Sequence, residues 1–200
     1  MISVSQNPGP SAWNELLPNR KTLPSLSGNL TSDWLIVGAG FAGLSAARRV
    51  QKEAPNDRIV ILDAQGLASG PAGRNSGFMI DLPHDLASDD YGGQIENDRE
   101  TIAQNRYAIN FAKETVEALQ LPKECFKEIG KINGAATAKG MRHNHDYAKH
   151  LSKLGEKYEY LDANSMKDIT GTNYYIGGLI TPGTVMIQPA LYIRTLGDKI

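Results

Sequence analysis

A short apolar run, a glycine-rich turn and a helix-like segment follow one another between residues 34 and 53. Residues 34–37 read Trp-Leu-Ile-Val, which is typical of a buried parallel strand, and a helix is expected over residues 41–53. Between them, Gly38 permits a tight turn, Gly40 lets a phosphate approach the backbone, and Gly43 lets the helix pack close to the strand. The segment therefore predicts a site for the pyrophosphate of a dinucleotide.

The surroundings of this turn supply the other parts of such a site. Phe41 and Ala42 begin the helix, where backbone N–H groups and the helix dipole attract phosphate. A second apolar run, residues 59–62, ends at Asp63, about 20 residues after Gly43, where an acid can accept hydrogen bonds from a ribose hydroxyl. G-x-G-x-x-G alone is a weak signal, and the alternative is an ordinary strand-turn-helix with a capping Asp63. The two strands and the spaced acid favour the dinucleotide site.

A second glycine-rich stretch, residues 66–79, follows the acid closely. It carries Arg74, Asn75 and Ser76 between glycines, so its backbone can lie against a large ligand and offer one cation and two short polar side chains. The first motif alone does not distinguish NAD from FAD. The second loop distinguishes the two cofactors, because it resembles the loop of a family that binds one of them.

The chain resembles the D-amino-acid oxidase-like (DAO) superfamily of FAD-dependent oxidoreductases, especially its glycine oxidase-like and glutamyl-polyamine oxidase-like branch. In that branch a serine- and glycine-rich stretch ending in Gly-Arg-Asn-x-Gly follows the second strand. The resemblance extends over roughly residues 30–200, and it includes further segments at residues 126–132, 160–163, 174–183 and 188–190.

This resemblance implies FAD as the cofactor. It assigns the pyrophosphate to Gly38, Gly40 and Gly43, the adenosine ribose to Asp63, and the cofactor surface towards the isoalloxazine to Arg74, Asn75, Ser76 and Gly77. Some relatives link the flavin covalently through a histidine in this loop. The comparable place here is Arg74, so we expect non-covalent FAD.

The implied activity is oxidation of the C–N bond of a small-molecule amine or amino acid, by hydride transfer to the flavin and hydrolysis of the resulting imine. FAD supplies the difficult chemistry, and the protein orients the substrate and excludes water. The alternative is a non-catalytic flavin- or nucleotide-binding regulatory or assembly protein on the same fold. Bleaching of the flavin by an amine would distinguish the two.

The expected fold class is α/β, with a Rossmann-like FAD-binding domain and an inserted, truncated α+β substrate domain. Residues 1–29 are expected to form an irregular tail, 30–122 the first part of the FAD-binding domain, 123–185 part of the substrate domain, and 186–200 the return to the FAD-binding domain. The family is about twice this long, and the chain stops inside a helix begun at Pro189. An N-terminal fragment, inactive by itself, is therefore expected, with a minimal flavoenzyme as the alternative.

Periodicity and capping residues predict the elements of the later half. A helix capped at residues 97–98 ends before Pro122, a strand covers 125–136, and a second helix covers 141–154. A short helix between Asp162 and Gly171 and a strand over 174–180 follow.

Composition narrows the class of protein. Lys and Arg number 21 against 22 Asp and Glu, giving a net charge of −1, so the chain lacks the basic surface of a nucleic-acid-binding protein. No export signal or membrane-spanning segment is evident in the sequence. The single cysteine, Cys125, cannot form an internal disulfide, is expected to be a buried small side chain, and suits a cytoplasmic location.

A cluster with two histidines and one separate histidine are candidates for a functional role. His143, Asp146 and His150 fall on one face of the predicted helix, but a solvated surface explains this pattern more simply than a metal site, so no metal is expected. His84 follows the flavin-facing loop and is a candidate for proton transfer or for pairing with a substrate carboxylate. A loop histidine bonded to Asp81 or Asp85 is the alternative.

Overall fold

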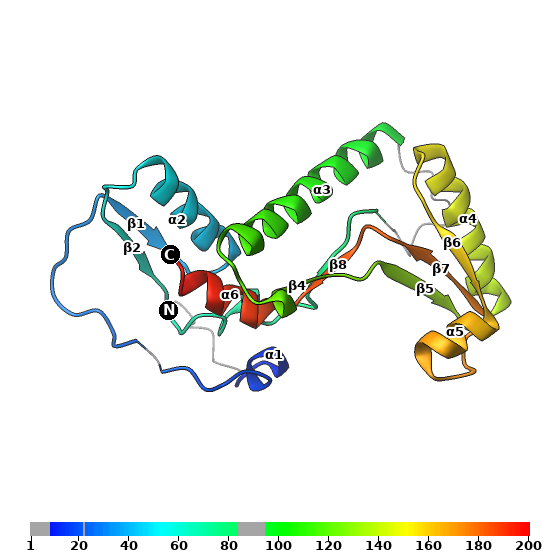
Figure 1. The fold of residues 1–200 in the computed structure, drawn as a ribbon, viewed down its shortest axis with the longest axis horizontal. Coiled ribbons are helices and arrows are strands. Elements are labelled where there is room, and N and C mark those ends of the chain that lie inside the picture. Colours follow the sequence, from blue (N-terminus) through cyan, green and yellow to red (C-terminus); the bar gives the residue numbers. More distant parts are fainter. Residues whose placement is uncertain (1–8, 22, 84–94) are drawn as a thin grey trace, which may run out of the picture. The chain divides into compact units, whose positions relative to one another are not determined.

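The computed structural model describes residues 9–21, 23–83 and 95–200, which form a mixed α/β chain (Figure 1). The chain forms two compact units. The first contains residues up to 77 together with 115–126 and 187–200, and the second contains 78–114 and 127–186. Residues 78–114 therefore lie in the second unit, although the sequence assigns them to the cofactor domain. The predicted domain limits stay a prediction.

The first unit contains the strand-turn-helix-strand segment. Strands β1 (Trp34–Val37) and β2 (Ile59–Leu62) pair in parallel along their whole length, and helix α2 (Phe41–Glu53) packs against both. Leu44 and Ala47 of α2 are buried. All three elements have the predicted bounds, because a continuous apolar run and a glycine turn are local signals.

Helix α6 (Pro189–Gly197) contacts several other elements of this unit. It packs against α2, against helix α1 (Ala12–Glu15), and against the 3-10 helices Pro71–Gly73 and Lys123–Cys125. The helix predicted to begin at Pro189 is confirmed. Helix α1 interrupts the tail that was expected to be irregular, and no sequence pattern predicted it.

The second unit contains an antiparallel sheet with the strand order β5-β7-β6. These strands are β5 (Lys131–Ala135), β6 (Glu159–Asp162) and β7 (Gly177–Thr181). Helix α4 (Ala138–Leu154) packs against β5 and β7, and helix α5 (Ala163–Thr170) against β6 and β7. Strand β7 is therefore the central strand.

Three ends of these two helices lie where the sequence predicted them, whereas α4 begins at Ala138, three residues before the predicted start at residue 141. Thr137 caps the start of α4, and Gly155 ends it in the left-handed conformation at φ 79°. The side chain of Asp162 accepts a hydrogen bond from the N–H of Ser165, and Gly171 closes α5 at φ 73°.

A third sheet has the strand order β3-β8-β4, formed by β3 (Phe78–Met79), β8 (Val185–Ile187) and β4 (Phe126–Glu128). Helix α3 spans Ile95–Ala118 and buries its predicted apolar positions 102, 109 and 112. The predicted cap at residues 97–98 is wrong, because the backbone is already helical at residue 95.

Two strand predictions also need correction. The strand expected over residues 125–136 is divided into β4 and β5 by Gly130, whose φ is 69° and whose N–H donates to the carbonyl of Thr184. Cys125 belongs to the preceding 3-10 helix, and it is buried as expected. The strand expected over 174–180 begins only at Gly177.

The core of the second unit joins α3, α4 and β7. Its buried members are Leu82, Ile102, Tyr147, Ala148, Leu151 and Leu179. The hydroxyl of Tyr147 donates to the carbonyl of Pro83 at 3.1 Å, so this buried ring has a polar partner.

Candidate functional site

The glycine turn of the first unit has the geometry that each glycine was expected to serve. Gly38 has a φ of 104°, which a residue with a side chain rarely adopts. A Cβ atom on Gly43 would lie 1.8 Å from the carbonyl oxygen of Gly38 and 3.3 Å from Cγ2 of Ile36. Gly43 therefore allows the close approach between α2 and the turn after β1.

The position of Gly40 differs physically from that of Gly43. A Cβ atom there would meet only Ala72 Cβ, at 3.6 Å, so the protein itself leaves room in front of this backbone. Phe41 and Ala42 are exposed in the first turn of α2, where backbone N–H groups lack intrahelical acceptors. An anionic group can thus approach the backbone at the start of this helix.

Asp63 lies where β2 ends, beside the glycine turn. Its Oδ2 accepts a hydrogen bond from the N–H of Ala39 at 2.7 Å, and its Oδ1 accepts one from the N–H of Gln65 at 2.8 Å. The structure therefore brings the predicted acid and the predicted phosphate turn together. A carboxylate has about four acceptor positions, so these two bonds leave capacity for ribose hydroxyls.

The second glycine-rich stretch folds back on itself around Pro71–Gly73. A Cβ on Gly73 would lie 2.1 Å from the carbonyl oxygen of Ala68. Gly77 has a φ of 80°, and a Cβ there would lie 2.3 Å from the carbonyl oxygen of Ile187. Glycine is therefore required at both positions by the fold of the loop itself.

The polar side chains of this loop hold its backbone. Arg74 donates from Nε to the carbonyl of Ser69 at 2.7 Å and from Nη2 to the carbonyl of Gly9. Asn75 donates to the carbonyl of Ala72 at 2.9 Å and accepts from the N–H of Gly77 at 2.8 Å. Ser76 is exposed beside them. Their assignment to the cofactor stays a prediction, and these contacts add a structural role for Arg74 and Asn75.

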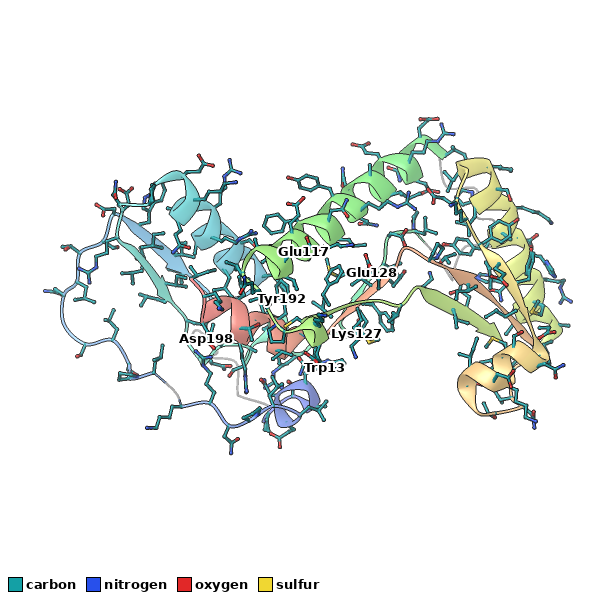
Figure 2. All side chains as sticks on the ribbon, viewed as in Figure 1. Trp13, Glu117, Lys127, Glu128, Tyr192 and Asp198 are labelled. Carbon is teal, nitrogen blue, oxygen red and sulfur yellow. The ribbon has the colours of Figure 1, made fainter. Side chains whose placement is uncertain are left out.

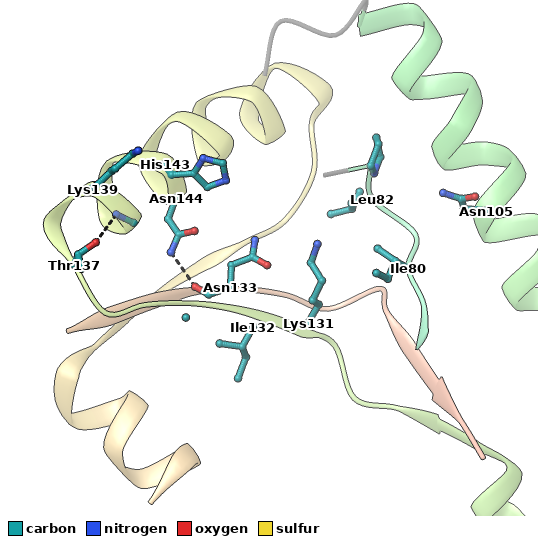
Figure 3. A pocket seen from close by; sticks show the side chains of 13 residues that line it. Ile80, Leu82, Asn105, Lys131, Ile132, Asn133, Thr137, Lys139, His143 and Asn144 are labelled. Atoms are coloured by element: carbon teal, nitrogen blue, oxygen red, sulfur yellow. Dashed lines mark hydrogen bonds between the residues drawn. The ribbon is translucent and has the colours of Figure 1, made fainter. Parts of the chain in front are cut away.

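A cavity of about 870 Å³ lies in the second unit, between α4, β5 and the segment after β3 (Figure 3). Its walls are mainly apolar, and the basic and amide side chains among them are Lys131, Asn133, Lys139, His143, Asn144 and Asn105. Burial lowers the pKa of Lys131, and the nearby charge of Asp81 opposes this effect. No motif singled out this cavity. The spacing of Lys131 and Asn133, two residues apart on a strand and so on one face, was the available signal.

Comparison with known proteins identifies the family. Residues 33–200 match the family described as FAD dependent oxidoreductase, designated DAO. The chain belongs to this family. The DAO resemblance drawn from the glycine turn and the Arg74 loop is thereby confirmed.

Two relatives and one solved structure illustrate the similarity. The probable oxidoreductase OrdL of Rhizobium meliloti (strain 1021) is 23% identical over 92% of this chain and 42% of its own length. Gamma-glutamylputrescine oxidoreductase of Escherichia coli (strain K12) is 26% identical over 88% and 42%. The crystal structure of glycine oxidase from Geobacillus kaustophilus superposes with a TM-score of 0.59 at 17% identity, covering 82% of this chain and 43% of that one. The DAO chain thus spans about two fifths of the length of the proteins that it matches.

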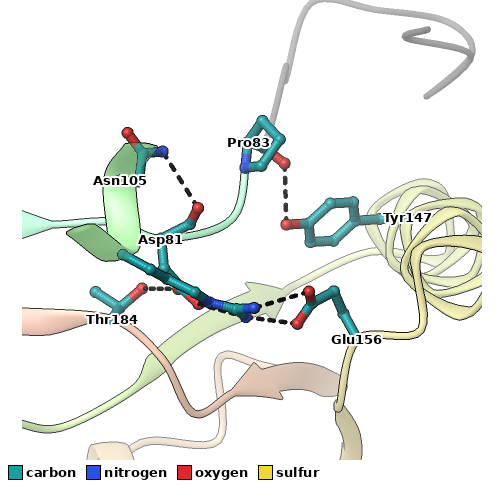
Figure 4. A network of polar contacts seen from close by, with 7 residues as sticks. Asp81, Pro83, Asn105, Tyr147, Glu156 and Thr184 are labelled. Atoms are coloured by element: carbon teal, nitrogen blue, oxygen red, sulfur yellow. Dashed lines mark hydrogen bonds and ion pairs between the residues drawn. The ribbon is translucent and has the colours of Figure 1, made fainter. Parts of the chain in front are cut away.

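In this DAO chain an ion-pair network around the half-exposed Arg106 joins α3 to the segments that follow β3 and α4 (Figure 4). Arg106 of α3 binds Asp81 at 3.1 Å and Glu156 at 2.5 Å. The Asp81 side chain is 1% exposed and also accepts from the hydroxyl of Thr184 at 3.4 Å. A Cβ on Gly183 would lie 1.9 Å from Oδ2 of Asp81, so the carboxylate fills the space beside that glycine. The network fixes the segment after β3 against α3.

The predicted helix face of His143, Asp146 and His150 does not form a shared solvated surface. His150 is buried, and its Nε2 lies 2.7 Å from a carboxylate oxygen of Asp98, whereas Asp146 is exposed and pairs with Lys149. The prediction that this helix face is a solvated surface is therefore wrong at His150. Within residues 9–21, 23–83 and 95–200, no three His, Cys, Asp or Glu side chains gather as a metal site.

Two further findings concern the described part of the DAO chain. None of its helices has both the length and the apolar character needed to cross a membrane. His84, the catalytic candidate, lies outside the described residues.

Proposed function

We propose that this chain supplies the cofactor-binding part of an FAD-dependent oxidoreductase that oxidises the C–N bond of an amine or amino acid. The observation that carries the proposal is the bond from the Ala39 N–H to Asp63, because it holds a carboxylate that could accept from ribose hydroxyls beside a turn that is open at Gly40. Two proteins that this chain resembles are named for such substrates: gamma-glutamylputrescine oxidoreductase and glycine oxidase.

The residues around the turn fit a dinucleotide. The start of α2 offers N–H groups to the pyrophosphate, and the space in front of Gly40 permits close approach. Asp63 offers acceptor capacity to the ribose. The Arg74 loop follows in the same unit and is proposed to border the flavin end, within a Rossmann-like domain that an α+β substrate domain interrupts.

FAD, when bound, would accept a hydride from the carbon that carries the amine nitrogen. The chain's own residues bind and orient the cofactor: Asp63 fixes the turn and the ribose, and the loop from residue 66 to residue 77 excludes water from one side of the cofactor. The substrate is proposed to be a neutral amine or amino acid. We propose non-covalent binding of FAD.

The deciding experiment is visible spectroscopy of the protein at its full natural length. The purified protein should carry a flavin spectrum, and anaerobic addition of secondary amines and amino acids should bleach it with at least one member of the panel. A flavin spectrum that no amine bleaches would favour a non-catalytic flavin-binding protein. A colourless protein that takes up no added FAD would refute the proposal.

A further inference from the structure

The N-terminal residues 9–20, called the N-terminal strap here, lie against the Arg74 loop. Their only helix, α1, is four residues long, which is too short to be stable without tertiary contacts. Its order therefore comes from the neighbouring parts of the first unit. Figure 2 shows Trp13, the largest side chain of the strap.

Three side chains of the strap donate hydrogen bonds to carbonyl groups of the loop. Ser11 Oγ, which is buried, donates to the carbonyl of Gly73 at 2.8 Å. Trp13 Nε1 donates to the carbonyl of Asn75 at 2.8 Å. These two bonds hold successive parts of the loop from one side.

Two further hydrogen bonds join the strap and the loop, one donated by the strap and one donated by the loop. Asn14 Nδ2 donates to the carbonyl of Ala68 at 2.8 Å. In the opposite direction, Arg74 donates to the carbonyl of Gly9. The strap therefore contacts the loop from its start to the predicted flavin-facing residues.

The other side of the strap is anchored to helix α6. Gln188, which caps α6, donates to the carbonyl of Trp13 at 3.0 Å. Arg194 donates to the carbonyl of Pro18 at 2.9 Å, and Arg20 forms a two-bond ion pair with Asp198. Because α6 is a packed helix, these bonds give the strap a fixed base.

Peptide geometry gives the strap a consequence for the loop. The C=O and N–H groups of one trans peptide unit lie in a plane and point in opposite directions. When Trp13 holds the carbonyl of Asn75, it also fixes the direction of the N–H of Ser76, away from the strap. Ser76 and Gly77 are the residues that the DAO resemblance places along the flavin.

We propose that the N-terminal strap, through Trp13, Ser11 and Asn14, is a positioning device that fixes the conformation of the loop backbone that borders the flavin. The inference rests on the proposed function, since it takes FAD as the ligand of this loop. These three residues are positioning residues, because they act through the loop backbone.

The test uses the protein at its full natural length. Trp13→Phe keeps an aromatic ring and removes the N–H donor, and Leu16→Ala is the matched control because Leu16, at the end of α1, is 73% exposed. In the absence of FAD, hydrogen exchange of the peptide covering residues 66–77 should become faster in Trp13→Phe and stay unchanged in Leu16→Ala.

With FAD present, loss of this one bond should raise the dissociation constant about five- to tenfold in a flavin-fluorescence titration. The visible flavin band of Trp13→Phe should also shift, while its melting temperature without FAD stays close to that of the unchanged protein. Equal exchange rates, or faster exchange with unchanged FAD affinity and spectrum, would overturn the inference. No FAD binding by the unchanged protein would refute the proposed function itself.

Discussion

The carboxylate of Asp63 lies 2.7 Å from the backbone nitrogen of Ala39, so the end of β2 is bonded to the turn that follows β1. Both groups of this bond belong to the protein, so the bond forms without a ligand. The acid therefore orders the turn before any ligand arrives, and the same side chain is proposed to bind the ribose. A substitution there should change two measurable properties, the stability of the protein and its affinity for FAD.

Asp63→Ala is expected to weaken FAD binding by about 1–3 kcal/mol, because it removes charge-assisted bonds to the ribose and loosens the turn. A flavin titration measures the first effect, and urea unfolding without FAD measures the second. Asp168→Ala, at an exposed position of α5, is the control and should change neither. Unchanged affinity in Asp63→Ala would place the ribose contact elsewhere.

Substitutions at Gly40 and Gly43 should have different effects, the first on FAD binding and the second on the stability of the fold. Gly40 has a φ of −87° and an open surrounding, so Gly40→Val should keep most of the fold while its side chain occupies the space of the pyrophosphate and abolishes FAD retention. Flavin stoichiometry after purification, alongside the circular dichroism spectrum, measures this pair of effects. Normal flavin content in Gly40→Val would contradict the assignment of the turn.

Gly43→Ala should act on stability instead. Its Cβ would lie 1.8 Å from the backbone oxygen of Gly38, so the helix must move away from the strand at a cost of about 1–3 kcal/mol. Urea unfolding without FAD is the measurement. Gly70→Ala is the matched control, because nothing lies within 4 Å of a Cβ at that position. Equal stability of the two variants would contradict the role given to Gly43.

The sequence predicted β1, α2 and β2 with their bounds because their signals are local. Helix α1 escaped prediction because its order depends on bonds from Ser11, Trp13 and Asn14 to residues more than fifty positions away. His150 was misjudged for the same reason, since its partner Asp98 lies on another helix. Periodicity reports which face of a helix is apolar, and it does not report which polar residue finds a buried partner.

Arg106→Gln should destabilise the second unit by about 1–3 kcal/mol, because it removes the guanidinium that pairs with the carboxylate of Asp81, which is 1% exposed. Chemical denaturation measures the loss. Arg99→Gln, which breaks only the exposed pair with Glu96, should cost about 0–1 kcal/mol. Adding Asp81→Asn to Arg106→Gln should restore part of the stability, and a double variant no better than the single one would contradict this explanation.

The flavin is expected to be released when the protein is denatured. Cys125 is fully buried, and burial raises the pKa of its thiol, so its reactive thiolate is scarce at neutral pH. Arg74, which the resemblance places where some relatives are expected to carry a flavin-linking histidine, cannot form such a bond. Acid precipitation should therefore leave the yellow colour in the supernatant. Colour in the pellet would show a covalent link, and peptide mass spectrometry would locate it.

The 200-residue chain, expressed by itself, should self-associate and should not oxidise amines. Parallel strands are normally covered on both faces, yet Leu35 and Val37 of β1 are 59% and 81% exposed, and the described residues provide only β2 as a partner strand. Exposed apolar side chains beside open strand edges favour association.

The sedimentation coefficient of the 200-residue chain should therefore rise with protein concentration, and the double variant Val37→Thr, Leu35→Gln should show a smaller rise. Leu23→Gln is the control, since Leu23 is also 81% exposed but lies outside any strand. A chain that stays monomeric at all concentrations, retains FAD and oxidises an amine would instead be a minimal flavoenzyme.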